Sequence, residues 1–178
     1  MSSLPFFVIM FTNPTYTNKQ FWLSIIVSGL CIGVIMILTH SYLLYFFGME
    51  NSYWHSLLYI LPLLLLSIAV ALFKHLFVWE SFSFKSAFLM TFMIGLLYSI
   101  ILSLFMLFSY NIFNFLDMKF SLGILSYNNE DITLQNNELT MQLLSPAATS
   151  LSMLVVNIIL DLVYSLIIAT FAKQNKSV

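Results

Sequence analysis

The stretch that decides the fold runs from Ala87 to Phe108 and reads AFLMTFMIGLLYSIILSLFMLF. It contains no Lys, Asp or Glu, and about 20 helical residues are enough to cross the hydrocarbon core of a bilayer. Apolar residues fill consecutive positions, so the alternating polarity of a membrane β-barrel strand is absent. The stretch is therefore predicted to be a transmembrane helix.

Three further stretches are also apolar and long enough to cross a bilayer, and they cover about 21–47, 54–73 and 149–172; only the last contains a charged residue. Of the 178 residues, 61% are hydrophobic and 7% are charged, whereas roughly a quarter of an average globular domain is charged. This composition excludes a water-soluble fold. The sequence predicts a single domain, an all-α integral membrane bundle of four transmembrane helices over residues 21–172.

Local signals mark some of the helix boundaries. Ser145-Pro146 precedes the fourth stretch, where serine suits the N-cap and proline suits the first helical position. Gly48 follows the first stretch and suits the end of a helix. Pro62 lies inside the second stretch and removes a backbone amide, so we expect a bend around Leu58–Pro62.

Lysines are distributed unequally between the two ends of the predicted bundle. Only Lys119 lies on one side, together with five acidic residues, and the other side carries Lys19, Lys74, Lys85, Lys173 and Lys176. The positive-inside rule places the lysine-rich end in the cytoplasm. Residues 1–20 and 173–178 are then cytoplasmic tails, and residues 109–145 form an extracytoplasmic stretch.

The inventory of reactive side chains is small. There is no arginine and no basic stripe, so the expected partner is the lipid bilayer and not nucleic acid. Serine, histidine and aspartate fall at different depths, so we expect no catalytic residue, no enzyme activity and no cofactor. His40, Glu50 and His55 have the residue types of a metal site, but their spacing matches no ligand motif, and no metal is expected.

Asp161 is the only charged residue inside a predicted span, and it lies near the centre of the fourth. An unpaired charge at this depth is costly, which makes such residues candidates for function. Four-residue spacing puts Asn157, Asp161 and Ser165 on one face, at the depth of Tyr98 and Ser99 in the third span. A structural, neutral, hydrogen-bonded carboxyl group is the favoured interpretation. A contact with another subunit and a proton or cation relay are the alternatives.

Small residues recur every four positions in two spans: Gly29 and Gly33 in the first, and Thr91, Gly95, Ser99 and Ser103 in the third. Such rows allow helices to approach closely in lipid. Packing within the chain is the favoured interpretation, and formation of a homo-oligomer through one row is the alternative.

The order of short motifs resembles a known bacterial family. Ser83-Phe84-x-x-Ala87-Phe88 is followed by a helix with Gly95 and Ser99, and then by Phe108-Ser109-Tyr110, Ser145-Pro146 and Ser165-Leu-Ile-Ile-Ala169. With the glycines of the first span, this pattern resembles the membrane family catalogued as domain of unknown function 4199. The resemblance implies a four-helix protein of the bacterial inner membrane and supplies no activity.

These observations favour a non-enzymatic structural or accessory subunit that acts through helix contacts with another membrane protein or with a second copy. The alternative is a small channel or transporter that uses Asp161.

The orientation gives the first testable prediction. In a Cys31→Ser background, Asn128→Cys and Ser177→Cys should react from opposite sides of the membrane with an impermeant maleimide, because the lysine-rich end faces the cytoplasm. Only Asn128→Cys should be labelled in intact cells. Labelling of both positions from outside would contradict the predicted topology.

Overall fold

The computed structural model describes residues 16–47, 56–78, 82–113 and 145–173. Over these residues the chain forms four α-helices: α1 (Asn18–Phe47), α3 (Leu57–Phe77), α4 (Phe84–Phe113) and α7 (Pro146–Ala172). Each helix is long and apolar enough to cross a membrane. The predicted fold class, an all-α membrane bundle of four helices, is confirmed.

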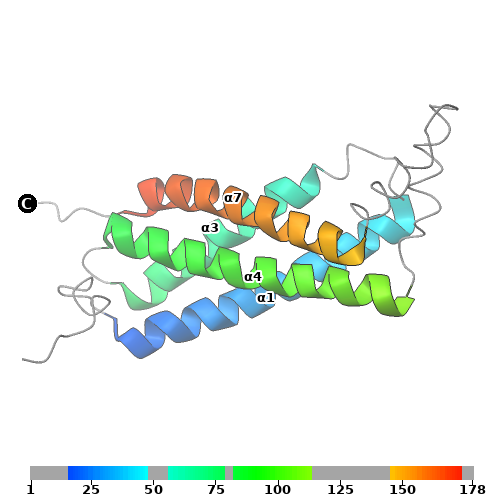
Figure 1. Cartoon of the computed structure of the whole chain (residues 1–178). Helices are drawn as coiled ribbons and strands as arrows, with labels where there is room; N and C mark the ends of the chain where they lie inside the picture. The colour runs from blue at the N-terminus through cyan, green and yellow to red at the C-terminus, as the bar shows by residue number, and fades with distance from the viewer. Residues whose placement is uncertain (1–15, 48–55, 79–81, 114–144, 174–178) are drawn as a thin grey trace, which may run out of the picture.

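The four helices lie side by side and alternate in direction, so that α1 begins and α7 ends at the same end of the bundle (Figure 1). Aromatic rings hold that end together. Tyr16 lies just before α1, and its ring centroid is 5.1 Å from that of Phe73 in α3 and 6.2 Å from that of Phe82, just before α4. All three side chains are buried, so the chain segments at this end share one apolar contact.

Several predicted helix boundaries were wrong by three to five residues. α1 begins at Asn18 instead of 21, and α7 at Pro146 instead of 149. α3 covers Leu57–Phe77 instead of 54–73, with residues 54 and 55 outside the described part. α4 covers Phe84–Phe113 instead of 87–108, so the first residues of the expected extracytoplasmic stretch are helical. Hydropathy locates the apolar run, whereas backbone hydrogen bonds continue through polar helix formers such as Lys74 and Lys85.

Hydroxyl side chains cap three of the helices. Ser145 Oγ accepts a hydrogen bond of 3.2 Å from the amide three residues later, which confirms the predicted N-cap of α7. Ser83 accepts in the same way at the start of α4, at 3.1 Å. Thr17 and Gln20 form a reciprocal capping box at the start of α1. α3 continues through the buried Pro62, and the bend expected there stays a prediction.

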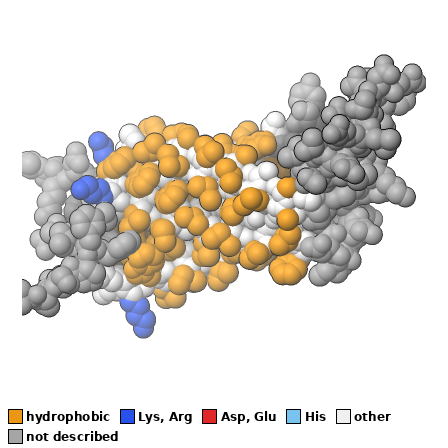
Figure 2. Space-filling model, viewed as in Figure 1, with side chains coloured by type: hydrophobic (Ala, Val, Ile, Leu, Met, Phe, Trp, Pro, Cys, Tyr) orange, Lys and Arg blue, Asp and Glu red, His pale blue; other side chains and the backbone are white. Residues whose placement is uncertain are grey.

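The outer surface of the bundle is apolar along its length. Large hydrophobic side chains are exposed on all four helices, for example Leu38, Ile60, Leu104 and Ile159. Figure 2 shows these side chains as a broad belt, with the visible lysines gathered at one end. A soluble monomer does not expose an apolar surface of this extent, whereas a bilayer covers it.

The described lysines all lie at that one end. Lys19 and Lys85 are in the first turns of α1 and α4, Lys74 is in the last turn of α3, and Lys173 is the C-cap of α7. Alternating helix direction brings these four positions together. Lys119 and Lys176 lie outside the described residues.

Close packing between α1 and α4 depends on the two glycines of α1. A Cβ atom added at Gly29 would lie 2.6 Å from Leu97 Cδ2 and 2.9 Å from Leu97 Cβ. A Cβ atom at Gly33 would lie 3.0 Å from Ile101 Cγ2. The small residues of α1 thus receive side chains of α4 within the same chain, which is the internal packing expected for this row.

Substitution of Gly29 should therefore weaken the bundle. Gly29→Ala should lower the free energy of unfolding by about 1–2 kcal/mol, because steric overlap with Leu97 exceeds the gain in helix propensity. Gly33→Ala should cost less, and Val34→Ala, at a position 54% exposed, should change it by less than about 0.5 kcal/mol. Equilibrium unfolding in mixed detergent and SDS micelles measures these values. A Gly29→Ala protein as stable as wild type would contradict this packing.

Candidate functional site

The side chain of Asp161 lies between α7 and α4 and is fully buried. Tyr98 Oη donates a hydrogen bond of 2.6 Å to Asp161 Oδ1, and Ser99 Oγ donates one of 2.7 Å to Asp161 Oδ2. Both donors are themselves buried. The expected contact of Asp161 with Tyr98 and Ser99 is present, and each carboxyl oxygen has its own hydroxyl donor.

Gly95 provides the space for this carboxyl group. A Cβ atom at Gly95 would lie 2.7 Å from Asp161 Cγ and 2.9 Å from Asp161 Cβ. Gly95 and Ser99 are one helical turn apart, so one residue of the α4 row makes room and the next donates a hydrogen bond. We call Asp161, Tyr98, Ser99 and Gly95 the carboxyl clamp.

Ser165 occupies the next turn of the same α7 face and is fully buried. Its Oγ donates to the backbone carbonyl of Asp161 at 2.6 Å, so it does not contact the carboxyl group. Four residues further on, Ala169 is also fully buried. On this side of Asp161 the α7 face therefore packs against the core, and the hydroxyl of Ser165 is satisfied within its own helix.

Ser103 forms a second polar contact between α4 and α7. Its Oγ donates to the carbonyl of Ser150 at 2.9 Å, and Ser150 Oγ donates to the carbonyl of Ser103. Sequence reasoning named Ser103 for packing and missed Ser150. The spacing could have indicated this contact, because Ser150 lies seven residues before Asn157, two turns away on the same helix face.

Tyr164 links α7 to α3, which sequence reasoning also missed. Its hydroxyl donates a hydrogen bond of 2.7 Å to the backbone carbonyl of Tyr59. A tyrosine inside an apolar helix gives no indication of which carbonyl it will reach. Only the position of α3 beside α7 determines this partner.

Asn157 was predicted to share a site with Asp161, but the carboxyl clamp does not include it. It lies one turn from Asp161 and lines a cavity with His40, which comes from α1. Glu50 and His55, the other residues considered for a metal, lie outside the described residues. Within the described residues, no group of three His, Cys, Asp or Glu side chains is close enough to hold a metal ion.

The carboxyl clamp joins α4 and α7 through two hydrogen bonds from hydroxyl groups to one carboxyl group. Its carboxyl group is enclosed by side chains, and the described lysines lie at the helix ends, far from the centre of α7. Hydroxyl groups are therefore its hydrogen-bond donors. In a bilayer such donors have no water to replace them, so separation of α4 from α7 would leave the group unsatisfied.

Comparison with protein-family models, with curated proteins and with solved structures finds no match to this chain. The resemblance to domain of unknown function 4199 therefore stays a prediction, and the candidate site stands on its geometry.

Two substitutions of Asp161 should have different effects on stability. Asp161→Asn keeps the shape and polarity of the group and should be nearly neutral. Asp161→Leu should lower the free energy of unfolding by about 1–2 kcal/mol, because the hydroxyl groups of Tyr98 and Ser99 lose their acceptor. Unfolding in mixed micelles measures both, with the exposed Leu162→Ala as the control. Equal stability of the Asn and Leu variants would show that these hydrogen bonds do not hold the helices.

Proposed function

We propose that this protein is a non-enzymatic subunit of the bacterial inner membrane that acts through its helix faces. The carboxyl clamp is the observation that carries the proposal. Asp161 is fully buried and both its oxygens accept hydrogen bonds from α4, which supports a role in helix packing. A transport site needs its carboxyl group to be reached by the transported ion, and here the bundle encloses it.

The surface of the bundle supports an accessory role. Leu97 and Ile101 of the same chain pack against the two glycines of α1, so this row of small residues contacts α4 within the chain. Exposed apolar side chains on all four helices leave ample area for a larger membrane protein or for a second copy. Contacts of that kind in lipid depend on the shape of the helix surface, since lipid tails are as apolar as the side chains.

The proposed orientation places both termini in the cytoplasm. It is supported by the four described lysines at the end where α1 begins and α7 ends, since short positively charged segments favour the cytoplasmic side. The proposed membrane is the inner membrane of a bacterium, as the resemblance in the sequence implies.

Affinity purification in mild detergent tests the proposal. Tagged wild type and Asp161→Asn should retain the same specific membrane partner, or the same homo-oligomer, because the Asn variant keeps the helix packing. Asp161→Leu should lose that assembly in proportion to its loss of stability.

Ion flux into proteoliposomes tests the transport alternative directly. Neither wild type nor Asp161→Asn should carry protons or cations above the level of empty vesicles. A flux that wild type shows and a stably folded Asp161→Asn protein lacks would replace the proposed role with that of a channel or transporter.

A further inference from the structure

A cavity of about 420 Å³ lies among all four helices, away from the lysine end. Its floor includes the buried Met36 of α1 and Leu102 of α4, and its other walls include Met153 of α7 and Leu58 of α3. This volume is within the range of small-molecule sites, roughly 300–1,000 Å³. The walls are mainly apolar, so the cavity suits an apolar molecule.

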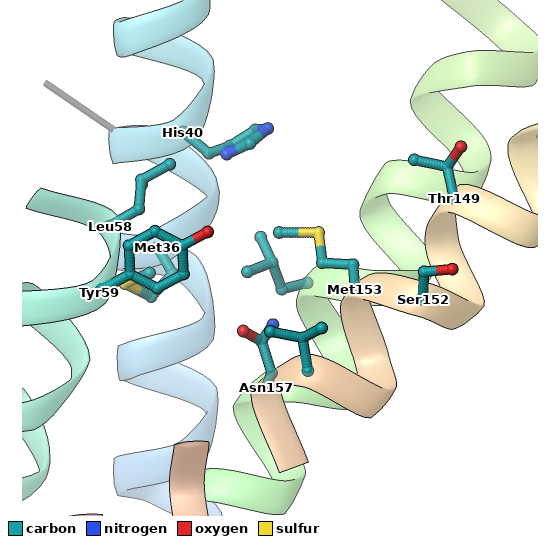
Figure 3. Close-up of a pocket in the computed structure, with 10 residues that line it drawn as sticks. Met36, His40, Leu58, Tyr59, Thr149, Ser152, Met153 and Asn157 are labelled. Carbon is teal, nitrogen blue, oxygen red and sulfur yellow. The ribbon is translucent and has the colours of Figure 1, made fainter. Parts of the chain in front are cut away.

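One polar group of the cavity requires a partner. Asn157 Nδ2 is buried and has no hydrogen-bond partner within the described part of the chain. Figure 3 shows the Asn157 side chain directed into the cavity, beside Met153 and across from Met36. A buried amide N–H without an acceptor costs free energy, so this position favours a ligand that brings an acceptor oxygen.

The rim of the cavity includes residues of the apolar outer surface of the bundle. Among them are Tyr59 of α3 and Val156 of α7, which are 53% and 47% exposed. Asn157 lies near the middle of α7, at a depth where bulk water does not satisfy an N–H group. An uncharged ligand suits this position, because the described lysines lie at the other end of the bundle.

We propose that this cavity binds an uncharged, lipid-soluble carbonyl compound whose oxygen accepts a hydrogen bond from Asn157 Nδ2. Met36 and Met153 provide flexible, polarisable walls that adapt to a flat ring or to an alkyl chain. The carbonyl could belong to a ring ketone such as a quinone or to the ester of a long acyl chain. This site is separate from the carboxyl clamp, because Asn157 is not hydrogen-bonded to Asp161 or to its donors.

Photolabelling with an alkyl benzophenone tests the proposal in nanodiscs. This probe is itself an uncharged aromatic ketone. On near-UV excitation its oxygen takes the hydrogen atom of a nearby C–H bond, and the two resulting carbon radicals combine, so that the adduct is a tertiary alcohol. Mass spectrometry should find adducts on Met36 and Met153. Met36 is the decisive position, because it is 2% exposed and does not lie on the outer surface of the bundle.

Three variants locate the binding. Asn157→Leu, which removes the donor at similar volume, should reduce Met36 labelling by about three- to tenfold, the loss expected for one hydrogen bond. Val156→Trp, which fills the cavity from its rim, should abolish that labelling. Thr170→Val, at an exposed position of the same helix, should leave it unchanged. Melting curves of all three show whether the fold is retained.

Competition distinguishes the two sources of the carbonyl. Loss of Met36 labelling with excess short-chain quinone identifies a ring ketone, and loss with excess long-chain methyl ester identifies an acyl ester. The proposal is overturned if neither competes, if Met36 is not labelled, or if Asn157→Leu is folded and labelled as well as wild type. Failure of this test would leave the proposed accessory role untouched, since that role depends on Asp161.

Discussion

A carboxyl group in the middle of a membrane helix must find its hydrogen-bond donors inside the protein, because the hydrocarbon core supplies none. Here the donors are the hydroxyls of Tyr98 and Ser99, both buried on α4. Together they set the register of α7 against α4, since a shift by one residue on either helix would separate donor from acceptor. The Ser103–Ser150 contact, about three turns away along α7, reinforces the same register.

Small residues are what make this close approach sterically feasible. Gly95 leaves room for the Asp161 side chain on one face of α4, and Gly29 and Gly33 of α1 leave room for Leu97 and Ile101 on another. α4 therefore packs closely on both α1 and α7, which are the two most extensive helix pairs of the bundle. Because water gives no driving force for helix association within lipid, the close packing at these glycines and the few polar contacts stabilise the bundle.

α7 packs far more extensively on α4 than on α3. Near Asn157 the space between α7 and α3 is left as the cavity, whereas the hydrogen bond from Tyr164 to the carbonyl of Tyr59 joins these two helices nearby. One helix face thus contains two different polar environments a single turn apart. Asp161 has its donors in place, and Asn157 faces an apolar space with an amide N–H that no described residue accepts.

The sequence by itself determined the four helices and their membrane character, because apolar runs of spanning length have no other stable arrangement in lipid. It also determined that Asp161 meets Tyr98 and Ser99, since four-residue spacing and antiparallel direction fix face and depth. The helix ends were missed by a few residues, because hydropathy does not report backbone hydrogen bonds. Only the tertiary structure decided which side chains pack against the glycines of α1, that Ser150 pairs with Ser103, and that Asn157 lines a cavity. These depend on the rotation and tilt of each helix, which the packing of all its neighbours sets together.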